Sequence, residues 1–244
     1  MRSVGLAFEV SQRVPFEPVQ FSKVDDVRAS FQFAWDMTFG NLGGHRDHRT
    51  GGITRRANGE IFANTFQGKM AEHAVCQFLA GRGLDVRPDL AVMELGAWDS
   101  FDLKIGSLVI AIKSTKKFGN LLLLEAADWE PDGTYRHGAE GSSTDVTTLV
   151  RVDPSPEDLL RKAKFLHKSQ CKLNDLKWVV APLEQYRFQV VGGVTRQFLA
   201  AAVRRGHFIP QGATLNGRTN LDADNYYVQA CDFSPIDQLL GQAS

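Results

Sequence analysis

Residues 98–117 read WDSFDLKIGSLVIAIKSTKK. The Gly-Ser dipeptide at 106–107 separates two runs that contain aliphatic residues, and it suits a tight two-residue hairpin turn. In such a hairpin the numbers of paired residues sum to 213, so Asp102 lies directly opposite Ala111. Because side chains alternate between the two faces of a strand, Lys113 shares the face of Ala111. The sequence therefore predicts a carboxylate and an ammonium group side by side on one face of a hairpin.

The other face of this hairpin is apolar. It receives four aliphatic side chains, those of Leu103, Ile105, Ile110 and Ile112. An apolar set with the period of a strand predicts packing against a core. We therefore expect Asp102 and Lys113 to lie on the face that does not pack into the core.

A face with these groups suits the hydrolysis of a phosphodiester. Carboxylate oxygens hold a divalent ion, usually Mg²⁺, which activates water and neutralises charge on the phosphate. A nearby cation helps to position the water and stabilises the transition state. One carboxylate alone provides few oxygen ligands for Mg²⁺. Two carboxylates opposed across a hairpin, with a lysine two residues after the second, make a good magnesium site.

The hairpin resembles the active-site hairpin of the PD-(D/E)XK, or restriction-endonuclease-like, nucleases. Their pattern is an aspartate followed, on the next strand, by Glu/Asp-x-Lys; Asp102 matches the aspartate and Lys113 matches the lysine. On the preceding helix, GKMAE at 68–72 resembles the segment whose glutamate, here Glu72, many members place near the metal. The resemblance covers residues 67–115. It implies an α/β fold with a restriction-endonuclease-like mixed central sheet flanked by helices.

Ala111 departs from this pattern, because it stands where the family has glutamate or aspartate and a methyl group binds no metal. Two explanations are open. The alanine is a substitution made to trap uncleaved substrate, which the fit of its neighbours to an active site favours, or it is natural and the missing carboxylate comes from elsewhere. Glu72 is the best internal substitute. In the second case the chain could also be a binding module with little or no catalysis.

The resemblance implies a metal-dependent DNA endonuclease that acts on double-stranded DNA and is impaired by Ala111. Mg²⁺, or Mn²⁺ in its place, would be held by Asp102 and Glu72, and Lys113 would position water or stabilise charge. Because a fold with one site needs two copies to cut both strands, a homodimer is expected. Two alternatives stay open, a non-catalytic DNA-binding protein on the same scaffold and a nuclease for RNA or single-stranded DNA.

Residues near this hairpin and in a glycine-rich segment are candidates for contact with DNA. Residues 39–60 are rich in Gly and Arg and are expected to form an exposed loop or arm. Arginines in such a segment suit phosphate contact, although a solubilising loop would look the same. The candidates are Arg46, Arg49, Arg55 and Arg56 in this segment, and Ser114, Thr115, Lys116 and Lys117 after the hairpin lysine. The latter four could equally be a solvated strand end.

A second basic stretch, RKAKFLHKSQCKLNDLK, covers residues 161–177. It belongs to a helix that is predicted to begin at Pro156, after the N-cap Ser155, and to run to about Leu173. Three lysines recur every four residues along one of its faces: Lys164, Lys168 and Lys172. Such a face could follow a DNA backbone, and it could as well be an ordinary solvated face.

The remaining elements follow from hydrophobic periodicity and from the positions of glycine and proline. Helices are predicted at 24–33, from 69 to the glycines at 81–83, and at 195–205; strands are predicted at 85–88, 90–94, 101–105, 108–114, 121–126, 147–152, 177–183, 188–191 and 226–230. We divide the chain into an N-terminal segment with the basic loop (1–60), a nuclease core (61–195) and a C-terminal extension of the same domain (196–244).

Composition limits the class of protein. The 244 residues are 43% apolar and 23% charged, as in a folded globular protein, and 28 Lys+Arg balance 28 Asp+Glu. A neutral chain argues against coating of nucleic acid by bulk charge but allows a local basic region. The three cysteines are far apart and indicate neither a disulfide framework nor a zinc site. We find no signal peptide and no apolar run that would span a membrane, and expect a soluble cytoplasmic protein of a bacterial, archaeal or phage-infected cell.

Overall fold

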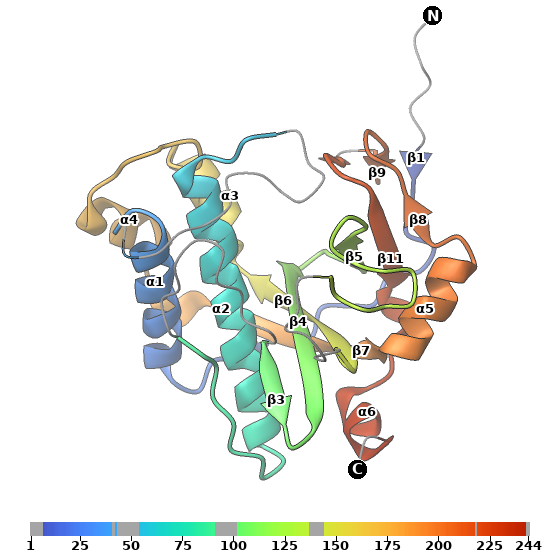
Figure 1. Cartoon of the computed structure of the whole chain (residues 1–244). Helices are drawn as coiled ribbons and strands as arrows, with labels where there is room; N and C mark the ends of the chain where they lie inside the picture. The colour runs from blue at the N-terminus through green and yellow to red at the C-terminus, as the bar shows by residue number, and fades with distance from the viewer. Residues whose placement is uncertain are drawn as a thin grey trace, which may run out of the picture.

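The structure is a computed structural model, and it describes residues 7–40, 42, 54–90, 102–136, 144–217 and 219–242. In these residues the chain is of the mixed α/β class, as expected (Figure 1). Its elements are β1 (Ala7–Phe8), β2 (Val19–Gln20), α1 (Val24–Met37), α2 (Asn58–Ala80), β3 (Leu103–Ile105), β4 (Leu108–Lys116), β5 (Leu121–Glu125), β6 (Val146–Asp153), α3 (Pro156–Lys162), α4 (Leu173–Val180), β7 (Arg187–Thr195), α5 (Arg196–Arg204), β8 (Phe208–Ile209), β9 (Thr214–Leu215), β10 (Thr219–Asn220), β11 (Asn225–Gln229) and α6 (Ile236–Gln242).

The main sheet has the strand order β2-β7-β6-β4-β3. Strands β4 and β6 are parallel, whereas β3 pairs with β4, β7 with β6, and β2 with β7 in antiparallel fashion. The interior strand β6 is buried along Val146–Val152, as expected of a strand with both faces covered. A parallel pair needs a crossover, and the chain makes it through β5, which belongs to a different sheet.

Helix α2 covers one face of the main sheet and lies beside α1 (Figure 1). Its 23 residues include buried side chains on all sides, because α1, α3 and the main sheet all pack against it. It begins at Asn58, earlier than expected, so the end of the basic segment 39–60 is helical. Gly59 allows the chain after α3 to pack against the start of α2, because a Cβ atom at residue 59 would lie 2.3 Å from the carbonyl oxygen of Phe165.

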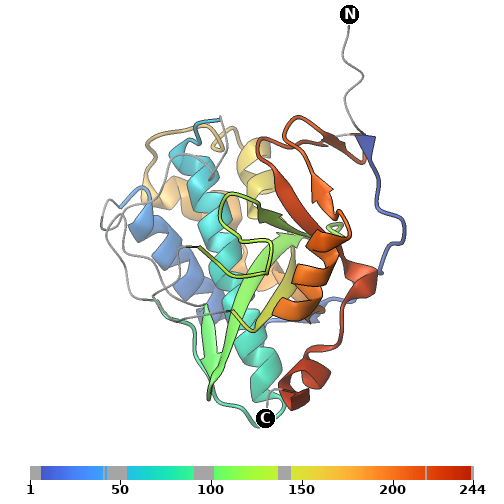
Figure 2. The ribbon, with the colours of Figure 1, turned by 45° about the vertical axis from the view of Figure 1, so that its right-hand side comes forward.

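The opposite face of the main sheet is covered by a second sheet, of order β5-β11-β8, and by α5 (Figure 2). An apolar cluster lies between them and includes Ala111, Leu122, Leu124, Trp129, Leu149, Val194, Leu199, Ala202 and Val228. Both faces of β4 are therefore buried over Leu108–Ile112. The expectation that the hairpin has one core face and one free face is wrong for this part of β4.

A buried arginine joins the two sheets to the N-terminal segment. Arg151 on β6 is 0% exposed, and its guanidinium donates hydrogen bonds to five acceptors. These are the carbonyl oxygens of Val14, Pro15 and Gly119 and the side-chain oxygens of Asn120 and Gln189. Burial lowers the pKa of Arg151 from its ordinary value. The network ties the chain before β2 and the turn before β5 to the middle of the main sheet.

Several predicted elements are confirmed. The helix expected at 24–33 is α1, and the strands expected at 121–126, 147–152, 188–191 and 226–230 are β5, β6, β7 and β11. Two helix starts are capped by hydroxyl oxygens: Ser155 Oγ accepts from the Asp158 amide at 3.3 Å, and Thr195 Oγ1 accepts from the Phe198 amide at 3.2 Å.

Three predicted elements are wrong. The helix expected to run to Leu173 ends at Lys162, where Lys164 takes a positive φ of 62°. Of residues 177–183, expected as a strand, 177–180 are the second half of helix α4, whose buried Leu176 and Val180 are four residues apart on one helical face, and the helix ends at Val180. Residues 85–88 form no regular element, and the strand expected at 90–94 lies outside the described residues after Leu90. The division of the chain at 60 and 195 stays a prediction. In the part of the chain described, no helix is both long and apolar enough to cross a bilayer.

Candidate functional site

The hairpin β3–β4 has the register predicted from its turn. Leu103 pairs with Ile110, Lys104 with Val109 and Ile105 with Leu108, and each pair sums to 213. Gly106 takes a φ of +59° in the turn, a conformation that favours glycine. The same register, continued by one residue, sets Asp102 opposite Ala111.

The Asp102 carboxylate is held against β4. Its Oδ2 atom accepts a hydrogen bond from the backbone amide of Ile112 at 2.6 Å. Strand β3 begins at Leu103, so this carboxylate oxygen takes the place of a backbone acceptor at the end of the ladder. Asp102 is thereby fixed next to position 111, and one of its two oxygens already has a backbone partner.

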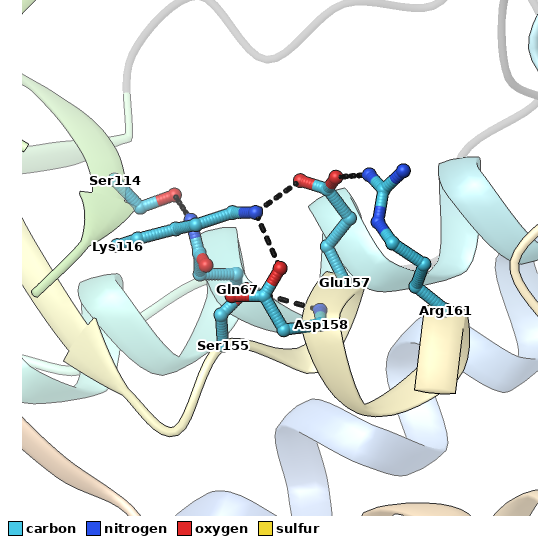
Figure 3. Close-up of polar contacts among 7 residues, drawn as sticks. All are labelled: Gln67, Ser114, Lys116, Ser155, Glu157, Asp158 and Arg161. Atoms are coloured by element: carbon cyan, nitrogen blue, oxygen red, sulfur yellow. Dashed lines mark hydrogen bonds and ion pairs between the residues drawn. The ribbon is translucent and has the colours of Figure 1, made fainter. Parts of the chain in front are cut away.

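Successive residues of β4 point to opposite faces of the sheet. Ser114 Oγ accepts a hydrogen bond from Gln67 Nε2 on α2 at 3.3 Å, so Ser114, with Ile110 and Ile112, lies on the face that α2 covers (Figure 3). Ala111 and Lys113 lie on the other face. Lys113 is half-buried, and it makes no ion pair or hydrogen bond with any side chain in the described part of the chain.

Ala111 is packed rather than open. It is 8% exposed and belongs to the apolar cluster beneath the second sheet. A carboxylate at this position would lie beside Asp102 in a weakly polar surrounding. Two carboxylates so placed repel each other, and a bound cation relieves that repulsion.

Glu72, the expected substitute for the missing carboxylate, has a different environment. It is buried, with 7% exposure, and its Oε2 atom lies 2.9 Å from Lys69 Nζ. Lys69 also donates to the Asp89 carbonyl at 2.7 Å, so the pair is enclosed by the chain that follows α2. Helix α2 packs on the sheet face opposite to that of Ala111 and Lys113. The structure thus brings Asp102, Ala111 and Lys113 together, and it places Glu72 on the helix across the sheet.

Other titratable groups of α2 line its contact with α1. His73 Nδ1 lies 3.6 Å from Asp26 Oδ1, and desolvation by burial lowers the pKa of His73. Burial, reinforced by the charges of Glu72, Asp26 and Asp85, raises the pKa of Cys76 to about 12. A thiol with such a pKa stays protonated at neutral pH, so Cys76 behaves as a small buried hydrophobe.

The residues present do not fit a magnesium site. In proteins Mg²⁺ is usually held by one or two carboxylates with free oxygens, and water and substrate phosphate complete its octahedral shell. Asp102 offers one oxygen without a backbone partner, Ala111 offers none, and Glu72 is bound to Lys69. Among the described residues, no three His, Cys, Asp or Glu side chains converge as metal ligands.

The residues expected to contact DNA after Lys113 are mostly engaged within the protein. Lys116 Nζ lies 2.7 Å from Asp158 Oδ1 and 3.1 Å from Glu157 Oε2, at the start of α3 (Figure 3). Lys117 Nζ lies 3.2 Å from Asp153 Oδ1. A phosphate at either lysine would have to compete with these carboxylates.

The other expected contacts are placed as follows. Thr115 is half-buried beside the turn at Gly119, where a Cβ atom would lie 2.2 Å from Thr115 Oγ1. Arg55 is exposed and Arg56 half-buried, and both have interaction partners in the protein. Arg46 and Arg49 lie outside the described residues.

Sequence reasoning missed the partners that fix this region. The link from Gln67 to Ser114 and the pairing of Lys116 with the first turn of α3 depend on tertiary contacts that no local pattern reveals. The acidic pair Glu157-Asp158 indicates a helix start, but spacing does not reveal that the pair also binds Lys116.

A 460 Å³ cavity lies at the turn end of the hairpin, away from Lys113. It is lined by residues that include Ser107, Asp145 and Arg196.

Comparison of the chain with protein families, with curated proteins and with solved structures found no match.

Proposed function

We propose that this chain is a restriction-endonuclease-like nuclease scaffold for DNA, impaired in cleavage by Ala111. The candidate site is Asp102, position 111 and Lys113. The observation that carries the proposal is the hairpin register. This register supports a site in which a carboxylate lies directly opposite position 111 and an ammonium group lies two residues further along the same face.

The chemistry assigned to each residue follows from its charge and position. The ammonium group of Lys113, which has no carboxylate partner in the described part, binds a non-bridging oxygen of a phosphodiester and offsets its charge. The carboxylate of Asp102 stays fixed by the Ile112 amide through one oxygen, which leaves its other oxygen without a backbone partner. Position 111 lacks the oxygen that would complete a metal site, so this chain binds its substrate without efficient hydrolysis.

Restoring the carboxylate tests the proposal. Supercoiled plasmid is incubated in Mg²⁺ or Mn²⁺ with this chain, with Ala111→Glu, and with the neutral, equal-sized Ala111→Gln. The Glu variant is expected to nick or linearise the plasmid faster than the other two, on the order of 10²-fold. Adding Lys113→Met to the Glu variant should remove that gain.

A homodimer belongs to the same proposal, because two copies would present one site to each strand of a duplex. Linear products that appear without a nicked intermediate would support paired sites. Sedimentation of the Ala111→Glu variant on a short duplex measures the stoichiometry directly.

A non-catalytic DNA-binding protein is the second candidate, and the packing of Ala111 favours it. An alanine that is 8% exposed in an apolar cluster has a structural use of its own. Cleavage by none of the variants, with retained binding of DNA, would select this candidate and exclude the nuclease.

A further inference from the structure

We propose that the segment from Arg161 to Trp178 is a docking surface for a single-stranded stretch of nucleic acid, with phosphates on its lysines and a base stacked on Trp178. The segment includes the last residues of α3, the connection to α4, and most of α4. The proposal deepens the proposed function by naming a substrate feature and where it is held.

Charge is concentrated in this segment. It contains six basic residues and one acidic residue, Asp175, a formal net charge of +5 in a chain whose total is zero. All six basic side chains are exposed: Arg161, Lys162, Lys164, Lys168, Lys172 and Lys177. Because the rest of the chain carries the balancing negative charge, a polyanion is steered towards this surface and away from the remainder.

The lysines of this surface are not neutralised by neighbouring acids. Arg161 is paired with Glu157, whereas the five lysines have no carboxylate partner in the described ranges. This differs from Lys116 and Lys117, which are paired with acids of α3 and β6. Unpaired surface lysines release counterions when they meet phosphates, which is the source of affinity for a nucleic-acid backbone.

Lys164 occupies a position where its side chain costs stability. Helix α3 ends with hydrogen bonds from the Phe165 amide to the Leu160 carbonyl at 2.8 Å and from the Lys164 amide to the Arg161 carbonyl at 3.1 Å. This is the Schellman arrangement, whose left-handed residue is usually glycine, and here Lys164 has a φ of 62°. A lysine kept in a strained position indicates a use for its charge.

Trp178 is the exposed aromatic side chain of this segment; Phe165 is only partly exposed and lies against Lys168 Nζ. It is 82% exposed on α4, next to Lys177, while Leu176 and Val180 face the core. An exposed indole in a basic segment offers a stacking plane for an unpaired base. Insertion into a bilayer would need several exposed apolar side chains together, and Trp178 is the one large hydrophobic in the described segment 161–180 that is exposed. Single-stranded nucleic acid is therefore favoured over a membrane.

The basic segment begins near the end of strand β4, on the side of the main sheet that α2 covers. Lys116, three residues after Lys113 on β4, is held by Glu157 and Asp158 on α3, and Glu157 is paired with Arg161 at the start of the basic segment (Figure 3). Lys116 shares the strand face of Ser114, which α2 covers, so a nucleic-acid strand bound along 161–178 would begin at the end of β4, across the sheet from Lys113.

The test measures the binding of a labelled oligothymidylate by fluorescence anisotropy, without divalent cations and across a salt series. The triple variant Lys162→Gln, Lys172→Gln, Lys177→Gln is compared with Lys23→Gln, Arg204→Gln, Arg205→Gln, which removes the same charge from exposed positions elsewhere. The first should lower the slope of log affinity against log salt by about 2, since each phosphate contact to a single strand contributes about 0.7. The second should leave the slope unchanged.

Two single variants separate the roles of charge and stacking. Trp178→Ala should weaken oligothymidylate binding roughly 5- to 100-fold with the same salt slope, and Trp178→Phe should keep most of the affinity. Lys164→Gly should lower the slope by about 0.7 while the melting temperature is unchanged or higher by about 2 °C, because the strain is removed. Loss of affinity without loss of stability cannot come from misfolding.

Four outcomes would overturn the inference. They are equal effects of the two triple variants, insensitivity of oligothymidylate binding to Trp178→Ala, duplex binding as tight as single-strand binding, and binding of phosphatidylserine vesicles in place of the oligonucleotide. The assay reads binding alone. If Ala111→Glu fails to cleave while these variants behave as expected, the nuclease proposal falls and the docking surface stands.

Discussion

Asp102 and Ile112 are joined by a hydrogen bond of 2.6 Å from the Ile112 amide to the Asp102 carboxylate, at the point where the β3–β4 ladder ends. This bond places a carboxylate beside position 111 without any metal. It also gives Asp102 a structural role that is separable from chemistry. The two roles lead to different expectations for different substitutions.

Replacing Asp102 distinguishes these roles. Asp102→Ala leaves the Ile112 amide without its acceptor and should lower the free energy of unfolding by about 1–3 kcal/mol. Asp102→Asn keeps an acceptor oxygen and should cost less than about 1 kcal/mol. Urea denaturation measures both, and equal losses for Ala and Asn would show that the hydrogen bond is not what holds the carboxylate.

Arg151 should be among the most sensitive positions of the fold. Its guanidinium is 0% exposed and donates hydrogen bonds to acceptors in three segments. Arg151→Ala therefore leaves several buried carbonyl and amide oxygens without a hydrogen-bond donor. We expect a loss of more than about 3 kcal/mol, with earlier proteolysis near Val14 because that segment loses its anchor. Arg187→Ala, at an exposed arginine of β7, is the matched control and should change stability by less than about 0.5 kcal/mol. Similar losses for both would contradict the importance of the network.

Stability should fall as the pH drops below 6.5, in part through His73. Its folded-state pKa is lowered from 6.5 because burial disfavours the imidazolium, and this outweighs the attraction of Asp26. The unfolded chain therefore binds more protons than the folded chain below pH 6.5. The contribution of His73 to the free energy of unfolding is thus fully present above pH 6.5 and is lost as the pH falls towards the folded-state pKa. The slope per group is at most about 1.4 kcal/mol per pH unit. The free energy of unfolding of His73→Gln should vary less between pH 7 and pH 5.5, and an unchanged pH profile would contradict this assignment.

Among the local sequence signals, the turn of the hairpin is the one that best predicts the candidate site. Gly106-Ser107 determined the register of β3 and β4, because a two-residue turn leaves one pairing and the pairing determines which side chains share a face. What surrounds those faces was not accessible in this way. The second sheet that covers Ala111 is built from β5, β8 and β11, which come from distant parts of the chain.

The errors in the sequence prediction have physical causes. Residues 177–183 contain a short apolar run, WVVAPL, that fits a strand by composition, and only the spacing of Leu176 and Val180 reveals the helix. The left-handed turn at Lys164 lacks the glycine that normally marks a helix end. Glu72 fitted the family pattern by spacing, but its buried pair with Lys69 depends on how the chain after α2 returns over the helix.

The most direct test of the central claim is the effect of Mg²⁺ on the stability and cleavage of Ala111→Glu. Without metal, this variant should be less stable than Ala111→Gln, since two carboxylates face each other in a weakly polar site. Saturating Mg²⁺ should stabilise Ala111→Glu alone, by about 2.7 kcal/mol at a hundredfold excess over Kd, and should switch on plasmid cleavage that Lys113→Met abolishes. If Mg²⁺ neither stabilises Ala111→Glu relative to Ala111→Gln nor supports cleavage, Asp102, position 111 and Lys113 are not a nuclease site.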